Sequence, residues 1–547
     1  MLFVLDTDPL TGKGRVEAHI QILYSGTADQ FSWVVPVTAT PTLDVGNDVL
    51  FDRLEPLTRP SYQLNWTTEG TCQGTGGGGG GCLPGGSSAS LSNSSAGGGF
   101  AGGSLQPPAV QVLFRGDVGP YESAVVKADD PAALKDWLNS NGYFVSDDAA
   151  RIVDDYVAAH SSFVALRLRQ GQDTSAIQPI VLRLPADEAC LPLKLTAIAA
   201  TPDVRINVWV LGSGRAVPIG YTEIGLDLAR LDWFGGGQNY DQLLGQAADE
   251  AGGNAFAVEY AQNTVTVASQ FTISEGQQAV LTSSTTPGLY IRQLTSMGFL
   301  LQGAVLRVFR RDLPLPAPLA EQGITEETFY KNIDNYWAGG PGVSPTLEIV
   351  FNPRTLTSDL NAAVFTPLQA FAPLFASHHT LTRLATFISP DEMNRDPVFV
   401  TNADLPDVSP VHRVTAALLC GDQRFDACHA PARLTIEDGS QVVYPVAAGA
   451  PKRCNPQVQP AYERGDLDAL PASTVGFARA ADSPGTVGVD NQATIAAGLA
   501  RHNAAVMARA SGSGGDCAVT GRARPVFPVA LPVGVAVLWA LRRRRRR

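Results

Sequence analysis

Alternating apolar and polar residues predict several strands in the first part of the chain. In GRVEAHIQILY, residues 14–24, apolar side chains stand at every second position, and Glu17, His19 and Gln21 fall between them. A period of two is typical of a strand with one buried and one solvated face, so we expect His19 to face solvent. Similar β-rich runs predict strands at residues 33–37, 110–114, 122–130, 162–168, 180–184, 193–199 and 204–211.

Helical spacing of apolar residues predicts a smaller number of helices. Residues 47–57 place their large apolar side chains on one side, and Pro56 is expected to end that helix. Asp130 followed by Pro131 is typical of a capped helix start. Further helices are predicted at residues 131–142, 149–160, 240–251 and 490–511, and residues 252–444 read as β-rich and mixed. Strands and helices in no strict alternation favour an α+β fold class with a β-rich ectodomain.

Changes in composition divide the chain. Residues 70–108 are mainly glycine and serine, with too few apolar side chains to offset the entropy of ordering, so we expect a disordered insertion. A phosphate-binding loop is the alternative, but it needs a GK[ST] motif that this segment lacks. The predicted organisation is a β-rich N-terminal part at 1–69, the insertion at 70–108, a main α+β ectodomain at 109–450, a C-terminal segment ending in a helix at 451–511, a flexible linker at 512–524, a transmembrane segment at 525–541 and a cytoplasmic arginine cluster at 542–547.

The charge balance argues against a nucleic-acid partner. The chain has a formal net charge of −12, and phosphate binding needs a basic surface. Arg522, Arg524 and the last six residues are basic, and no acidic residue follows Asp516, so the body is more acidic than the whole chain. An acidic surface favours solubility instead.

Cysteine usage favours an oxidising compartment. Six of the seven cysteines lie before the tail, an even number as in the disulfide framework of an exported protein. Bridges from Cys72 to Cys82 or from Cys420 to Cys428 are sterically easy, but spacing does not fix the connectivity, and free thiols in a cytosolic protein are the alternative. The candidate disulfide cysteines are Cys72, Cys82, Cys190, Cys420, Cys428 and Cys454.

The densest group of titratable residues consists of His378, His379, Asp391 and Glu392. Adjacent histidines in a strand point to opposite faces and cannot both bind one metal, and the HExxH spacing is absent. One interpretation of this group is a metal or catalytic site. The alternative is a polar, hydrogen-bonded surface.

A second group of candidate ligands has spacings too wide for a zinc knuckle and better suited to disulfides. It consists of His412, Cys420, Cys428, His429 and Cys454. His502 shares a helical stripe with apolar residues and is expected at the edge of a packed face. No GxSxG nucleophile elbow occurs. The sequence therefore predicts no catalytic residue, no metal site and no cofactor.

The end of the chain is typical of a membrane anchor. Residues 525–541 carry no charge and would span about 25 Å as a helix, against a hydrocarbon thickness of roughly 30 Å. A dense basic cluster holds its side of the membrane in the cytoplasm, so we expect the body outside. A buried terminal strand with a basic end, or a nucleic-acid arm, is the alternative. The topology anchor consists of Arg542, Arg543, Arg544, Arg545, Arg546 and Arg547.

The tail also resembles the MYXO-CTERM-type sorting signal of myxobacterial surface proteins. The tail contains, in this order, a flexible linker ending in GGDC, a short spacer, an apolar segment and LRRRRRR. The resemblance implies that Cys517 is the processing and attachment point and that a C-terminal sorting enzyme is a partner. The first residues lack a basic region and a long apolar run, so we expect the true start, with its leader, upstream of Met1.

The body resembles a bacterial family known as domain of unknown function twenty-three thirty. Four stretches carry this resemblance, in the order FSWVVPVTATPTLDVGNDVLFDRLEPLTRPSY, LKDWLNSNGYFV, DDYVAAHSSFVALRL and HHTLTRLATFISPDEMNRDPVFV. They imply coverage from residue 1 to about residue 430, and an exported surface protein for which the family supplies no catalytic residues.

Two functional hypotheses follow. The first is an exported, membrane-anchored or surface-sorted bacterial protein with a binding or structural ectodomain whose extracellular ligand the sequence does not identify. The alternative is an extracellular hydrolase with a site around His378, His379 and Asp391.

Overall fold

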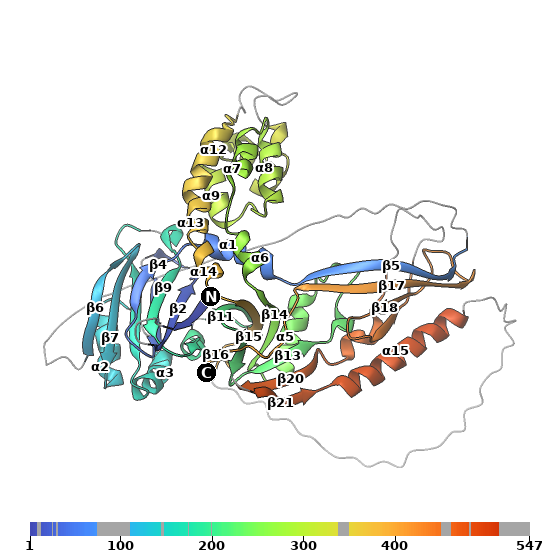
Figure 1. Cartoon of the computed structure of the whole chain (residues 1–547), viewed down its shortest axis with the longest axis horizontal. Coiled ribbons are helices and arrows are strands. Elements are labelled where there is room, and N and C mark those ends of the chain that lie inside the picture. The colour runs from blue at the N-terminus through green and yellow to red at the C-terminus, as the bar shows by residue number, and fades with distance from the viewer. Residues whose placement is uncertain are drawn as a thin grey trace, which may run out of the picture.

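The central feature of the fold is a sheet built from strands distant in sequence (Figure 1). The structure is a computed structural model that describes residues 1–7, 12–24, 26–28, 31–73, 110–143, 147–172, 174–198, 200–336, 349–449, 461–480 and 483–512. The ten described strands of this sheet lie in the order β21 (Ser483–Asp490), β20 (Ser473–Ala480), β13 (Thr222–Leu226), β14 (Ala255–Asn263), β15 (Thr380–Ile388), β11 (Val204–Gly212), β1 (Leu2–Thr7), β2 (Gly14–Ile20), β9 (Ile180–Pro185) and β4 (Thr42–Val45).

Strand β1 shows how the two faces of the central sheet are used. It is parallel to β11 and antiparallel to β2. Leu2 and Val4 point into a core formed with helices, whereas Phe3 points into a core shared with a second sheet. Successive side chains of a strand point to opposite faces, so apolar residues at consecutive positions mean that both faces are covered.

A second, four-stranded sheet covers one of these faces. Its order is β3 (Ser32–Val37), β8 (Ser162–Leu168), β7 (Tyr121–Ala128) and β6 (Val110–Val118). Helices α2 (Pro131–Ser140) and α3 (Asp147–Ala158) pack on its far side through Leu134, Leu138 and Val157. The Asp130 carboxylate accepts hydrogen bonds from two backbone N–H groups of α2, as its sequence predicts. A three-stranded sheet, β10 (Ala189–Cys190), β16 (Val398–Asn402) and β12 (Arg215–Ile219), lies beside this body.

Short helices cover the opposite face and rise from it as a tower (Figure 1). Helix α1 (Val49–Thr58) lies at its foot, and the tower contains α6 (Val265–Ser269), α7 (Glu275–Thr282), α8 (Pro287–Ser296), α9 (Gly303–Asp312), α10 (Ala317–Glu321), α11 (Glu326–Lys331), α12 (Pro353–Leu360), α13 (Thr366–Gln369) and α14 (Ala372–Ala376). A π-helical turn at Asn361–Phe365 joins α12 to α13. Side chains from these helices form one continuous core with Leu2 and Val4 of the sheet.

A long arm extends from the side of the central sheet (Figure 1). Its sheet has the order β19 (Gln441–Tyr444), β18 (Ala432–Thr435), β17 (Val411–Asp422) and β5 (Ser61–Thr71). Strands β5 and β17 run parallel over eleven residue pairs. Helices α5 (Tyr240–Glu250) and α15 (Gln492–Gly512) contribute to the core at the base of this arm.

The mixed, β-rich fold class is confirmed, but four local expectations are wrong. Residues 265–336 and 349–376 form helices where β-rich and mixed sequence was expected. The run expected as a strand at 193–199 begins with α4 (Leu193–Thr196), because a short apolar run does not separate a strand from a helix. Pro56 lies within the last turn of α1 instead of ending it. The insertion begins later than residue 70, because β5 continues to Thr71.

His19 is also placed differently from the expectation. Its side chain is buried and its ring meets Phe371 edge-on, with the centroids 5.8 Å apart. His19 Nε2 lies 2.9 Å from Glu17 Oε1 on the same face of β2. The hydrogen bond to His19 is the largest cause that lowers the pKa of Glu17 to about 2. The polar phase of β2 therefore faces the helical tower, which the alternation of the strand could not reveal.

The predicted transmembrane segment at 525–541, the arginine cluster at 542–547 and Cys517 lie outside the described residues. Within the described ranges, we find no helix with the length and apolar character needed to cross a membrane.

Candidate functional site

The fold does not bring together the first group of candidate residues. His378 and His379 directly precede β15, whereas Asp391 and Glu392 follow its other end. A nine-residue strand separates the two pairs by roughly 30 Å. Glu392 instead accepts a hydrogen bond from the backbone N–H of Ser389 at 2.8 Å. The four residues of this candidate group therefore do not form one site.

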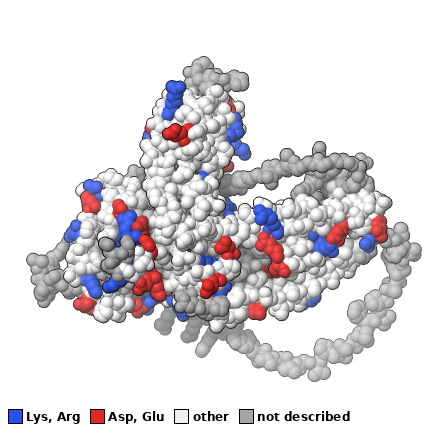
Figure 2. All heavy atoms as spheres, viewed as in Figure 1, with Lys and Arg blue, Asp and Glu red and all other residues white. Residues whose placement is uncertain are grey.

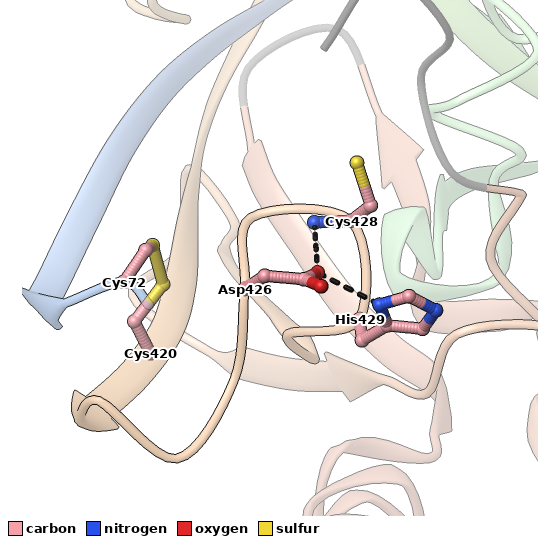
Figure 3. The surroundings of a disulfide bond; sticks show 5 residues. All are labelled: Cys72, Cys420, Asp426, Cys428 and His429. Carbon is pink, nitrogen blue, oxygen red and sulfur yellow. Dashed lines mark hydrogen bonds and ion pairs between the residues drawn. A yellow bond between two sulfur atoms is a disulfide. The ribbon is translucent and has the colours of Figure 1, made fainter. Parts of the chain in front are cut away.

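The second predicted group is also dispersed. His412 lies near the start of β17 and bonds Glu437 through Nδ1 at 3.1 Å, while Cys420 lies near the other end of that strand. His429 Nδ1 lies 2.7 Å from Asp426 in the loop after β17 (Figure 3). Across the parts of the chain that the structure describes, no three His, Cys, Asp or Glu residues are close enough to hold a metal ion. Cys454 lies outside the described residues.

A disulfide bond joins Cys72 to Cys420 at the far end of the arm (Figure 3). It links β5 to β17 across 348 positions of sequence, with the two Cα atoms 4.8 Å apart. Both sulfur-bearing residues are buried in a small cluster with Ala430. The two local bridges considered from spacing, Cys72–Cys82 and Cys420–Cys428, do not form. Strand β17 pairs in parallel with β5, which precedes Cys72, so that Cys72 and Cys420 bond to each other instead.

Two glycines allow this close approach of β5 and β17. Gly70 and Gly421 face each other, both with positive φ, and a Cβ on Gly70 would lie 2.3 Å from the carbonyl oxygen of Gly421. Glycine alone adopts such a conformation at little cost. The register shifts between Leu419 and Gly421, which places Cys420 at an irregular point of the ladder.

The remaining described cysteines differ in state. Cys428 is disulfide-bonded, whereas Cys190 in β10 is a free thiol, so its assignment to the disulfide set is wrong. Burial raises the pKa of Cys190 to about 12, which keeps it in the unreactive thiol form at neutral pH. Cys82 lies outside the described residues.

The strongest charged cluster of the body is one that the sequence did not suggest. Arg383 in β15 has a side chain with 0% exposure, and its Nε lies 2.6 Å from Oε2 of Glu259 in β14, at an angle unsuited to a hydrogen bond. Its Nη2 donates to Glu55 of α1 at 2.9 Å. The guanidinium carbon lies 5.2 Å from the ring centroid of Trp209 in β11. Arg383 thus connects the sheet to the foot of the tower.

The other oxygen of Glu259 extends this network towards the arm. Glu259 Oε1 accepts hydrogen bonds from Arg205 Nη2 at 2.8 Å and from the Tyr240 hydroxyl at 2.9 Å. Burial, followed by the charge of Glu259, raises the pKa of Tyr240, so its hydroxyl remains a donor. One buried carboxylate therefore receives two guanidinium groups and one phenol. Glu259 and Arg383 are closed to solvent, and their network links the sheet to α1 and α5.

Asp227, at the base of the arm, has a buried carboxyl group whose charged form is disfavoured by its surroundings. Asp227 accepts a hydrogen bond from the backbone N–H of Ala229 at 3.0 Å, while its Oδ2 has no partner among the described residues. Burial raises the pKa of Asp227 to about 6. The folded protein thus keeps this proton at pH values where the unfolded chain releases it.

We expect this proton to produce a measurable pH dependence. Between about pH 4 and pH 6 the folded state binds one proton more than the unfolded state, so the free energy of unfolding falls as pH rises, by about 3 kcal/mol in total. Asp227→Asn cannot titrate and should flatten this part of the curve, measured by urea unfolding at each pH. The exposed Asp391→Asn is the control and should leave the slope unchanged. An unaltered slope in Asp227→Asn would contradict the assignment.

Comparison with known proteins adds a family but no activity. Residues 12–236 match a family described as "Uncharacterized protein conserved in bacteria (DUF2330)". This part of the chain is similar to the DUF2330 family. The chain matches no curated protein and no solved structure. The DUF2330 match ends well before residue 430, so β14, β15 and β17 lie outside it.

The DUF2330 region supplies one partner of the disulfide and one partner of the Arg205–Glu259 ion pair. It contains Cys72 and Arg205, whereas their partners Cys420 and Glu259 lie beyond residue 236. The matched region, from β2 to β13, therefore makes both of these contacts with later parts of the chain.

Proposed function

We propose that the chain is an exported bacterial envelope protein whose body acts outside the cytoplasm as a binding or structural ectodomain. The observation that carries this proposal is the disulfide between Cys72 and Cys420. Such bonds form and persist in oxidising compartments and are rare in the bacterial cytosol. This disulfide closes a very long loop, and its sulfur atoms are buried, so it belongs to the folded body and not to a surface accessory.

The charge distribution and the tail sequence agree with this location. On the face shown in Figure 2, acidic and basic side chains are intermingled, without a continuous basic patch for nucleic acid. The apolar run at 525–541 with its following arginines supports an anchor that keeps the extreme end in the cytoplasm. Cys517 is the proposed attachment point, and a sorting enzyme that recognises the tail is the proposed partner.

The proposal favours binding or structure over hydrolysis. The residues named for the alternative hydrolase are separated by the length of β15, and the buried network around Glu259 is closed to solvent. Neither of these two groups of residues therefore supports hydrolytic chemistry.

Fractionation of the bacterium that encodes the chain tests the anchor. We expect the wild-type protein in the membrane or surface fraction, and both Cys517→Ala and a deletion of residues 527–547 to be released from it. Cys190→Ala is the control, because it removes a thiol that forms no bond. Unchanged retention of both tail variants would refute the anchoring role.

A further inference from the structure

The foot of the tower contains a buried positive charge without a negative partner. Arg53 of α1 has a relative exposure of 5%, and among the described residues it forms no ion pair. Burial lowers the pKa of Arg53, which means that its environment disfavours the charge. Buried charges in proteins are normally paired, so the burial of the unpaired Arg53 charge must have a specific cause.

Neutral acceptors hold the Arg53 guanidinium in a fixed position. Nε donates to the Gln270 carbonyl at 2.9 Å and Nη2 to the Gln270 side chain at 3.1 Å. Nη1 donates to the carbonyls of Met297 and Gly298 at 3.1 and 2.7 Å. These carbonyls follow the ends of α6 and α8, where helix dipoles partly offset a positive charge. A Cβ on Gly298 would lie 2.4 Å from Nη1, so the backbone approaches the guanidinium too closely for any residue with a side chain.

One donor of this guanidinium is left for a ligand. Arginine has five N–H groups, and the four bonds above leave one on Nη2. Within the described part of the chain, neither this N–H nor the side-chain amide of Gln277 has an acceptor. The flat ring of Phe299 lies under the guanidinium, 4.6 Å from its central carbon, which fixes its plane.

Arg53 forms the floor of an open cleft between α1, α6, α7 and α8. The cleft has a volume of about 450 Å³, and its polar side chains include Arg53, Ser269, Thr272, Ser274, Gln277 and Ser296. No acidic side chain lines it. Figure 1 shows α1 and α6 beside each other at the foot of the tower. The cleft therefore combines one fixed positive charge with hydroxyl and amide groups at a solvent-exposed rim.

From this geometry we propose that the cleft binds a small ligand through an oxyanion, a phosphate or a carboxylate, that pairs with Arg53. A preorganised guanidinium is well suited to such groups, and the charge-assisted hydrogen bond would supply the missing negative partner. The volume fits a ligand of small-metabolite size. This inference goes beyond the proposed location, because it holds in any compartment.

The test is calorimetric titration of the full chain with inorganic phosphate and, in a separate arm, with citrate. We expect wild-type protein to bind at least one of them, and the tighter of the two identifies the oxyanion. Ser296→Glu places a negative charge at the rim and should weaken binding about tenfold. Ser283→Glu is the matched control, since Ser283 and Ser296 are both exposed and each donates to the carbonyl three residues earlier in its helix.

Ser283→Glu should leave the affinity within about twofold, because it does not line the cleft. This comparison does not require a substitution of the buried Arg53, which could prevent folding. Absence of heat from both anions up to about 10 mM, or equal effects of the two glutamate variants, would overturn the proposal.

Discussion

Replacement of both Cys72 and Cys420 by serine lowers the free energy of unfolding by about 5 kcal/mol, the largest effect expected of any change considered. The bond closes a loop of 348 positions, and the entropy that a crosslink removes from the unfolded chain grows with loop length. Denaturant unfolding of the oxidised wild type and of the double variant measures the difference. The loss should be accompanied by fraying of β5 from β17, visible as faster amide hydrogen exchange in both strands.

Cys190→Ala provides the matched control for the loss of a cysteine. Cys190 is the free thiol of β10, so its removal breaks no covalent bond and should cost about 1 kcal/mol. A reducing agent added to the wild type should destabilise it at least as much as the double substitution does, because it also breaks the disulfide of Cys428. Equal stabilities of the double variant and Cys190→Ala would contradict a structural role for the bond.

Glu259→Ala is expected to cost about 3–5 kcal/mol, because it removes the buried carboxylate partner of Arg383 and leaves only the partly exposed Glu55. The same change also removes the acceptor of Arg205 and of the Tyr240 hydroxyl. Thermal and denaturant unfolding both report the loss, provided that the variant is purified under the same oxidising conditions as the wild type.

An exposed ion pair gives the comparison for Glu259. Glu326 pairs with Arg310 at 2.6 Å on the tower, where both side chains are partly solvated. Glu326→Ala should cost less than about 1 kcal/mol, since water and salt screen the pair. If Glu259→Ala destabilises the protein no more than Glu326→Ala does, the buried network does not hold the central sheet, α1 and α5 together.

The strands of the body were readable from the sequence, and most of the tower was not. Alternation located β2, and runs of β-rich residues located β3, β8 and β11. The tower helices have ten residues or fewer, so the spacing of their apolar residues does not separate them from strands. Their caps were the available signal: Ser274 with Gln277 is a capping box, and Thr286 precedes a proline at the start of α8.

The contacts of greatest consequence could not be predicted from local sequence. Cys72 and Cys420 meet only because β5 and β17 pair in parallel, and spacing favoured nearer partners. Glu259 and Arg383 lie on neighbouring strands that are separated by the whole tower in sequence. Arg53 gave no signal, because its acceptors are backbone carbonyls and an amide rather than a charged partner.

The redox state of Cys72 and Cys420 in the living bacterium tests the central claim most directly. Cells are quenched with acid, free thiols are alkylated without reductant, and the linkage of cysteine peptides is read by mass spectrometry. An oxidised envelope protein predicts a peptide pair that joins Cys72 to Cys420, together with alkylated Cys190. Alkylation of Cys72 and Cys420 without prior reduction would contradict folding outside the cytoplasm.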